Sequence, residues 1–248
     1  MNLFQSSKNF ILDTLFPISC LSCGRGDDWL CNECLKNIEL LSFQKCPICE
    51  KVITENGQTC PPCKPKSHLD TLLVATNYKD SSISKIIHLY KYRFIEDLSF
   101  PLGKILSKAF LQSNLPIPDF IIPIPLHPRR MRWRGFNQSQ KLAECISENM
   151  APGLKITICN DVLQRARFTS PQMRIKNYNQ RLENLRNAFI INENEQALPQ
   201  NVLHNKTVLL LDDVATTGAT LFECAKTLKR YGVKKVSAIV VARQEINN

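Results

Sequence analysis

The sequence predicts an α/β fold in which helices flank a mostly parallel sheet, with a small cysteine-rich domain in front of it. Apolar runs typical of buried strands alternate with stretches of helical spacing, which favours parallel strands joined by helices. Eight of the 11 cysteines form Cys-x-x-Cys pairs between residues 20 and 63. The pairs stop just before the first buried-strand pattern, so we place the domain boundary there and expect domains at 1–70 and 71–248.

Composition narrows the classes of protein that this chain can belong to. No apolar run in the 248 residues reaches the roughly 18 needed to cross a bilayer. Lys8 and Asp13 interrupt the N-terminal apolar stretch, which favours a short amphipathic helix over a signal peptide. Both observations favour the cytoplasm. The net charge of +10 comes from residues 71–248, and a basic surface attracts nucleic acid or phosphorylated small molecules.

The four Cys-x-x-Cys pairs predict two zinc sites. Two thiolates three residues apart on a tight turn can bind one ion, and a second such turn completes a tetrahedron. Consecutive pairs would give two sites, with an interleaved cross-brace as the alternative: Cys20, Cys23, Cys31 and Cys34, then Cys46, Cys49, Cys60 and Cys63. Four cysteines leave no position for substrate, so the zinc should be structural. A disulfide framework does not suit a cytoplasmic chain, and we expect His68 to be solvated.

The second domain begins with a strand at 72–78 and helices at 81–92 and 97–111. In the first helix, Lys85, Lys91 and Arg93 are interpreted as a solvated face rather than an anion contact. The next elements are expected in the order strand 119–126, loop 127–138, a helix that Asn137 caps and whose interior carries Leu142 and Ile146, strand 156–163 and loop 164–174. The last are helix 177–187, strand 188–192, surface connection 193–205, strand 208–211, helix 221–231 and strand 236–242.

The segment from Val208 to Thr220 carries the most informative pattern. Four large apolar residues are followed by Asp212 and Asp213, a Thr/Gly turn and a helical pattern. Ligands of parallel sheets lie beyond the carboxyl ends of the strands, and N–H groups at a helix start bind anions. The carboxylates call for hydroxyls or a metal ion, so a sugar phosphate meets both demands. The alternative is a capped helix without a ligand, but two buried carboxylates without partners are costly.

The predicted loop 127–138 follows an apolar strand and contains four arginines but no acid, namely Arg129, Arg130, Arg132 and Arg134. Arginine binds phosphate oxygens with two parallel hydrogen bonds, and this charge density suits pyrophosphate. Trp133 stands between Arg132 and Arg134, and Phe136 follows two residues later, so stacking on nucleic-acid bases is the alternative. The basic segment 164–174 is expected to be a mobile loop that closes over a ligand.

Two family resemblances follow from these patterns. The segment 208–220 resembles the loop of type I phosphoribosyltransferases that binds phosphoribosyl pyrophosphate (PRPP). The whole chain resembles the ComF family of competence-associated proteins in three successive features. These are the cysteine pairs, then Pro123-x-Pro125 with Arg134-Gly-Phe-Asn-Gln138, and then Arg165-x-Arg167-x-Thr169-x-x-Gln172 with Arg181-x-x-Asn184 and the acidic loop.

The ComF resemblance implies a double zinc ribbon at 1–70 joined to a phosphoribosyltransferase-like domain at 71–248. Members of the family are associated with the handling of imported single-stranded DNA during natural transformation, which the resemblance implies as a role for this chain. Asp212 and Asp213 would hold the ribose hydroxyls and support Mg²⁺. The 5′-phosphate would be held by Ala215, Thr216, Thr217, Gly218 and Thr220. Pyrophosphate would be neutralised by Arg129, Arg130, Arg132 and Arg134.

Three functional hypotheses are compatible with the sequence. The first is a PRPP-binding protein, either non-catalytic or an active transferase of nucleotide metabolism, with the acceptor base undefined. The second is a single-stranded DNA-binding module for DNA uptake. The third is an adaptor whose zinc ribbons dock a protein partner such as a DNA-uptake helicase.

Overall fold

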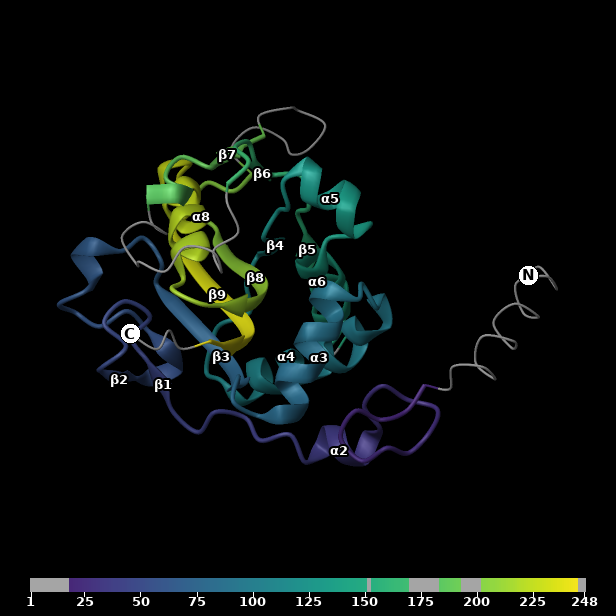
Figure 1. Cartoon of the computed structure of the whole chain (residues 1–248). Coiled ribbons are helices and arrows are strands. Elements are labelled where there is room, and N and C mark those ends of the chain that lie inside the picture. The colour runs from purple at the N-terminus through teal and green to yellow at the C-terminus, as the bar shows by residue number, and fades with distance from the viewer. Residues whose placement is uncertain (1–17, 151–152, 170–182, 193–201, 245–248) are drawn as a thin grey trace.

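The computed structural model describes residues 18–150, 153–169, 183–192 and 202–244 (Figure 1). The predicted amphipathic helix near the N-terminus lies outside these residues. Most of the predicted helix 177–187 and of the connection 193–205 also lies outside them, as does the second half of the basic segment 164–174. Among the described helices, none is both long enough and apolar enough to cross a membrane.

The centre of the molecule is a five-stranded sheet in which every pair of neighbouring strands is parallel. From one edge to the other, its strands are β3 (Thr71–Asn77), β9 (Lys235–Arg243), β8 (Thr207–Ala215), β4 (Phe120–Pro123) and β5 (Thr157–Ile158). The predicted parallel sheet is confirmed. Its strands are continuous apolar runs because both faces of the sheet are covered.

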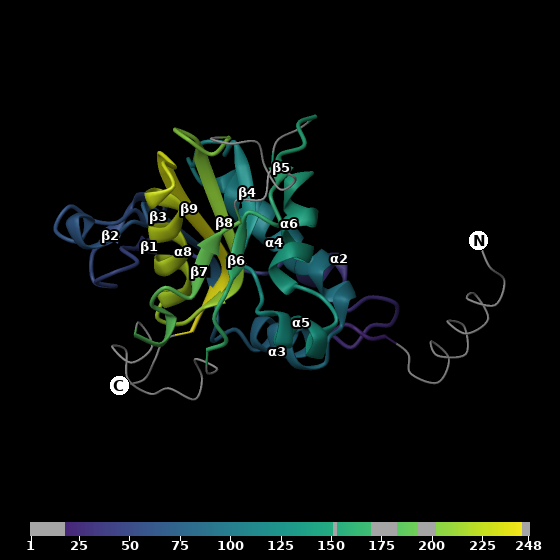
Figure 2. The same cartoon turned by 90° about the horizontal axis from the view of Figure 1, so that it is seen from above.

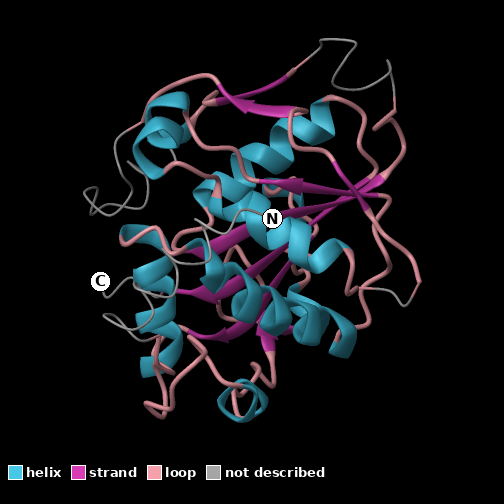
Figure 3. Ribbon diagram, turned by 90° about the vertical axis from the view of Figure 1, so that its right-hand side faces the viewer, coloured by secondary structure: helices cyan, strands magenta, loops and turns pink. Residues whose placement is uncertain are grey.

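Helices pack on both faces of the sheet (Figures 2 and 3). One face carries α3 (Ser81–Tyr92), α4 (Ser99–Gln112) and α6 (Gln138–Ser147), and the other carries α8 (Ala219–Arg230). Alternate residues of β8 serve the two cores, because successive side chains of a strand point to opposite faces. Leu209 and Leu211 pack with the three helices, whereas Val208 and Leu210 pack with α8.

The structure differs from the predicted elements at three places near the carboxyl edge of the sheet. The expected loop 127–138 contains a helix, α5 (Pro128–Arg134). Pro128 starts it, the Nδ1 atom of His127 caps it, and Gly135 ends it with φ of 82°. The expected strand 156–163 is divided into β5 and β6 (Leu163–Arg165), and β6 pairs with β7 (Phe189–Ile191) in a separate antiparallel ribbon. β8 continues past both acids to Ala215.

The cysteine-rich segment lies along the edge of the sheet rather than apart from it (Figure 1). Its elements are α2 (Asn32–Lys36), β1 (Gln44–Lys45), β2 (Ile53–Thr54) and two short 3-10 turns, Glu55–Gly57 and Lys64–Lys66. A third 3-10 turn, Glu96–Leu98, lies outside this segment and directly precedes α4. The backbone N–H of Leu41 donates to Ala75 (2.9 Å), and the Gln44 amide pairs with the backbone of Val74. The segment therefore covers the edge strand β3. Without this cover, the free backbone groups of β3 could pair with a strand of another chain and cause aggregation.

Candidate functional site

Asp212 and Asp213 lie near the carboxyl end of β8 and are both held by neighbouring groups. Oδ1 of Asp213 lies 2.9 Å from Nζ of Lys91 and accepts the N–H of Val214. Oδ1 of Asp212 accepts the hydroxyl of Ser139 at 2.9 Å and the N–H of Asp213. Asp213 is only 4% exposed. The two carboxylates are thus fixed in orientation by α3, α6 and the strand itself.

Burial and mutual repulsion control the protonation of this acidic pair. Burial raises the pKa of Asp212 to about 7, and the charge of Asp213 adds to that effect. Lys91 and the Ser139 hydroxyl oppose the rise. Burial would lower the pKa of Lys91, but the charges of Asp213 and Asp212 outweigh it and hold that pKa above its ordinary value. Lys91 therefore stays charged and compensates one of the two acids.

Lys91 is a site residue that the sequence interpretation missed. Its side chain is 21% exposed and points to the acidic pair rather than to solvent. The residue spacing in α3 could have predicted this direction of the Lys91 side chain, because Lys91 follows the buried Ile83 and Ile87 at intervals of four residues. Positions four apart lie on one helix face, so Lys91 continues the apolar face toward the sheet.

The turn that follows β8 joins the strand directly to α8. Gly218 adopts φ of 78° at the start of α8, a conformation that favours glycine. An added Cβ there would lie 2.9 Å from the Phe222 ring. The Oγ1 atom of the buried Thr217 accepts the N–H of Ala219 at 3.3 Å. We call residues 215–220 the phosphate turn, after the ligand that the sequence predicts there.

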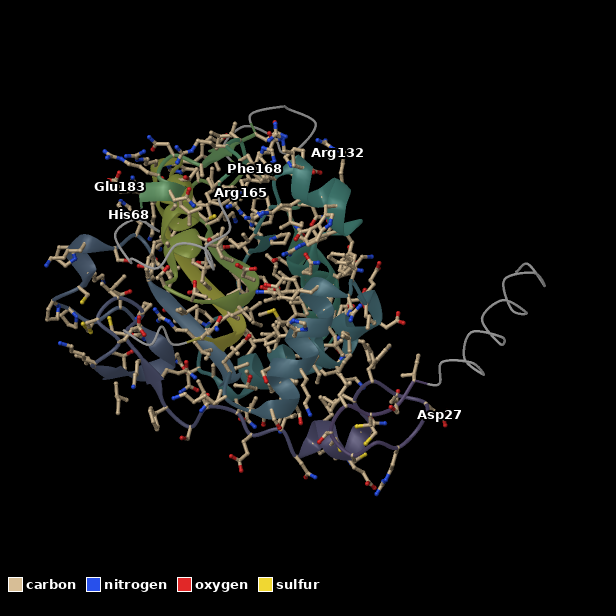
Figure 4. All side chains as sticks on the ribbon, viewed as in Figure 1. Asp27, His68, Arg132, Arg165, Phe168 and Glu183 are labelled. Atoms are coloured by element: carbon tan, nitrogen blue, oxygen red, sulfur yellow. The ribbon has the colours of Figure 1, made fainter. Side chains whose placement is uncertain are left out.

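The helix α5 divides the four predicted arginines into two pairs. Arg130 and Arg134 lie one turn apart and are half-buried. Arg134 donates to the Oε1 atom of Gln138 at 2.9 Å, and Arg130 donates to the carbonyl of Thr169 at 3.3 Å. Arg129 and Arg132 are exposed instead, and Figure 4 shows Arg132 at the outer rim of α5. The structure therefore directs only one pair of these arginines inward.

A third buried cation joins the inner pair. Arg165, at the end of β6, is 7% exposed and donates to the Thr169 hydroxyl. Burial, followed by the charge of Arg130, lowers the pKa of Arg165 to about 10. The charges of Asp212 and Arg134 also act on it, so these groups share one region. The sequence assigned Arg165 to a mobile loop, because its antiparallel pairing with β7 depends on residues more than 20 positions away.

Buried donors without acceptors mark the same region. Among the described residues, Nε of Arg134, Nε2 of Gln138 and Nε of Arg165 are buried and have no hydrogen-bond partner. A buried donor without an acceptor costs about 1–3 kcal/mol, so most such groups in native proteins have partners. An anion between α5, the start of α6 and β6 would accept these N–H groups.

Exposed aromatic rings accompany the outer arginines. Trp133 is 63% exposed, and its ring meets the Phe94 ring edge-on at 4.9 Å. Phe168 is 46% exposed and lies between the His127 ring at 5.1 Å and the Arg129 guanidinium at 5.3 Å. Figure 4 shows Phe168 above Arg165. Flat rings beside cations are suited to stacking on nucleic-acid bases.

The eight paired cysteines form two clusters in sequence order rather than an interleaved cross-brace. The clusters are Cys20, Cys23, Cys31 and Cys34, and then Cys46, Cys49, Cys60 and Cys63. Within each cluster all sulfur atoms lie within 4.8 Å of one another. The Sγ atoms of Cys23 and Cys31 are 3.8 Å apart, and those of Cys49 and Cys60 are 3.9 Å apart. Zinc bonds of about 2.3 Å in a tetrahedron place sulfurs about 3.8 Å apart, so both clusters fit zinc.

The other cysteines and His68 take no part in these clusters. Cys159 and Cys224 are buried, and Cys145 is half-buried. His68 is exposed, in agreement with the expectation that it is solvated. N–H groups of Val52 and Lys51 point to the Cys49 sulfur and lower the pKa of this thiol to about 6. A thiolate that is stabilised in this way is ready to bind a metal ion.

Comparison with known proteins places this chain in a family. Competence protein F of Haemophilus influenzae is 30% identical over 238 residues, which span 92% of this chain and 98% of that protein. The chain belongs to the ComF family. DNA utilization protein YhgH of Salmonella typhi is 28% identical over 86% of this chain and 96% of the relative. Competence protein ComFC of Streptococcus pneumoniae is 28% identical over 94% and 96%, respectively.

The fold of this ComF-family protein also matches a recognised domain. Residues 173–247 match the phosphoribosyl transferase domain, and they include β8, the phosphate turn and α8. A purine phosphoribosyltransferase from Pyrococcus horikoshii aligns at 16% identity over 62% of this chain and 75% of its own, with a TM-score of 0.30. The predicted phosphoribosyltransferase-like fold is confirmed by the domain match and by the parallel sheet flanked by helices.

Proposed function

We propose that this ComF-family protein binds PRPP together with Mg²⁺ at the carboxyl end of β8. The observation that carries the proposal is the group of buried donors without acceptors on Arg134, Gln138 and Arg165, close to the carboxylate of Asp212. An anionic ligand that also presents hydroxyls satisfies both halves of this site. PRPP has a 5′-phosphate, a pyrophosphate and a ribose, and it meets these demands with one molecule.

Different residues of the chain would bind different parts of the ligand. Asp212 and Asp213 each use Oδ1 for protein contacts, and their Oδ2 atoms would accept the ribose hydroxyls. Carboxylate oxygens also suit Mg²⁺, which proteins usually bind through one or two carboxylates and the phosphates of a substrate. Bound Mg²⁺ would neutralise charge on the pyrophosphate. The phosphate turn, from Ala215 to Thr220, would hold the 5′-phosphate at the start of α8.

The inner pair Arg130 and Arg134, with Arg165, would bind the pyrophosphate. The proposal concerns binding and not turnover. Transfer of the phosphoribosyl group would also need a surface that recognises an acceptor base, and the residues named above do not supply one.

The test is calorimetric titration of PRPP with Mg²⁺ into the full-length protein. Replacing both acids, Asp212→Asn with Asp213→Asn, removes the ribose and metal contacts without adding bulk. We expect at least a tenfold loss of affinity. The control is Asp97→Asn, which removes an exposed carboxylate elsewhere and should leave binding intact. An unchanged affinity in the double variant would overturn the proposal.

A second candidate function is favoured by the outer face of α5, and it is binding of single-stranded DNA. Arg129 and Arg132 are exposed beside the rings of Trp133 and Phe168. Relatives are named competence and DNA utilization proteins, which suits this role. Binding to an oligonucleotide, followed by fluorescence anisotropy, should weaken as salt rises. Absence of a salt dependence would contradict it.

We also infer that the two cysteine clusters hold structural zinc and that the protein works in the cytoplasm, where thiols stay reduced. The adaptor hypothesis is less favoured as an independent function. It expects that deleting residues 1–66 removes a partner contact but leaves PRPP binding intact, whereas Leu41 and Gln44 bind the edge strand of the sheet.

A further inference from the structure

Arg243 connects the second cysteine cluster to the phosphate turn. It is the last residue of β9 and lies in register with Ala215, the last residue of β8. Its Nε atom donates to the carbonyl of Thr216 at 3.2 Å. Its Nη2 atom donates to the carbonyl of Pro47 at 3.2 Å and to the carboxylate of Glu50 at 2.7 Å. Pro47 belongs to the Cys46–Cys49 turn, so one side chain spans both structures.

The same cysteine turn also faces a cavity that the start of α8 lines. Ile48 lines a cavity together with Ala219 and Phe222, which belong to the first turn of that helix. Phe222 in turn limits the space beside Gly218. The Cys46–Cys49 turn is therefore joined to the phosphate turn through Arg243 and the Thr216 carbonyl, and it lines one cavity with the start of α8.

The chemistry of the arginine side chain suits this connection. A guanidinium is planar and offers donors in a fixed fork, so it can hold acceptors from two segments at a set distance. The Arg243 side chain is only 12% exposed, which limits competition from water. The Pro47 carbonyl can act as a fixed point only if the turn that carries it is rigid, and metal binding by Cys46 and Cys49 would make it so.

The first cysteine cluster has no comparable connection among the described residues. It packs against the opposite part of the molecule, where Leu35 and Ile38 line a cavity with Ile105 of α4 (Figure 1). Within the described part of the chain there is thus an internal control: two four-cysteine clusters, of which the second alone is joined to the phosphate turn.

We infer that metal binding at the second cluster sets the conformation of the phosphate turn, with Arg243 as the positioning residue that connects them. Loss of this metal, by chelation or by thiol oxidation, would loosen the turn and weaken binding of a phosphate ligand. Loss of the first metal would not. The consequence for ligand affinity rests on the proposed PRPP function, whereas the effect on the turn does not.

The test measures hydrogen exchange of the amides at 217–220 in the ligand-free, full-length, zinc-loaded protein. Arg243→Gln should speed exchange there about tenfold, because local opening is no longer opposed by the fork. Cys49→Ser, which breaks the second cluster, should have the same effect. The matched controls are Arg230→Gln, which removes an exposed arginine at the end of α8, and Cys23→Ser in the first cluster. Neither should change exchange in the turn.

Arg243→Lys separates positioning from general stability. Lysine keeps the charge beside Glu50 but cannot hold the Thr216 and Pro47 carbonyls together. The thermal midpoint of Arg243→Lys should therefore lie closer to that of the wild type than the midpoint of Arg243→Gln does. Exchange in the turn of Arg243→Lys should nevertheless stay fast. Slow exchange in folded Arg243→Lys and Cys49→Ser proteins would overturn the inference, as would equally fast exchange in Cys23→Ser.

A parallel titration with PRPP and Mg²⁺ distinguishes this inference from the proposed function. If wild-type protein binds PRPP, Arg243→Gln should bind it about tenfold more weakly and Arg230→Gln normally. If wild-type protein does not bind PRPP, the proposed function fails, and the exchange measurement alone still decides whether the second cluster controls the turn. Normal PRPP affinity in Arg243→Gln and Cys49→Ser would contradict the coupling.

Discussion

Nζ of Lys91 lies 2.9 Å from Oδ1 of Asp213, so α3 supplies a cation to the carboxylates at the end of β8. This contact changes the electrostatic character of the site. Two unpaired acids would repel a phosphorylated ligand, whereas one of these acids is already compensated. Asp212, with a pKa raised to about 7 by burial and by Asp213, carries only part of a charge at neutral pH.

Replacing Lys91 by Met should destabilise the protein and weaken PRPP binding. Removing one partner of a buried ion pair leaves the other charge without compensation, at a cost of about 3 kcal/mol for a pair that keeps slight solvent contact. Urea unfolding measures the loss. Lys85→Met is the matched control, since Lys85 lies on the same helix and is exposed. Equal stabilities of the two variants would show that the Lys91–Asp213 pair contributes little.

The pH dependence of stability should carry the signature of Asp212. Its pKa in the folded protein lies above the ordinary value, so folding favours the protonated form. The corresponding stability is fully present below pH 4 and is lost as pH rises through about 7. The free energy of unfolding of the wild type should thus fall between about pH 4 and 7 relative to Asp212→Asn. Parallel pH profiles of the two proteins would contradict this.

Divalent cation binding should follow the opposite trend with pH. Metal binding requires the ionised carboxylate, so the affinity for Mn²⁺, followed by water proton relaxation, should rise from pH 6 to pH 8. Using the metal alone avoids titration of the phosphates of PRPP. Asp97→Asn should show the wild-type trend, and Asp212→Asn should lose it. If the Mn²⁺ affinity of wild-type protein did not change with pH, Asp212 would not be part of the cation site.

The two faces of α5 should have separable functions. Arg130→Gln and Arg134→Gln should each weaken PRPP binding about tenfold, as expected for loss of a charge-assisted hydrogen bond. Arg129→Gln and Arg132→Gln remove the same charge from the same helix. They should leave PRPP affinity unchanged but weaken the binding of single-stranded DNA. If all four substitutions weakened PRPP binding equally, the four arginines would belong to one common site.

Trp133→Ala should weaken oligonucleotide binding by about 1–3 kcal/mol, the usual contribution of one base stacked on an aromatic ring. Phe100→Ala, which removes an exposed ring from α4, serves as the control. The Asp212→Asn and Asp213→Asn double variant should retain or improve DNA binding while losing PRPP. Loss of both ligands in that variant would indicate a single shared site.

The fold could be predicted from the sequence wherever it depends on a local pattern of residues. The buried strands and the helices on both faces follow from apolar runs and helical spacing, and the sulfur distances agree with the predicted cysteine sites. Long-range contacts were not accessible. The pairing of Arg165 through β6 and β7 and the reach of Arg243 to Pro47 depend on how distant segments pack. The helix α5 is a different case, because its Pro128 start and Gly135 end were visible in the sequence.

The central claim is that the carboxyl end of β8 binds PRPP through its acidic pair and its inward-facing arginines. The most direct measurement is a calorimetric titration of the full-length protein with PRPP, with Mg²⁺ and without it, compared with the Asp212→Asn and Asp213→Asn double variant. We predict saturable binding to one site per chain that requires Mg²⁺ and is lost in the double variant. Absence of binding in wild-type protein with Mg²⁺, or undiminished binding in the variant, would contradict the account.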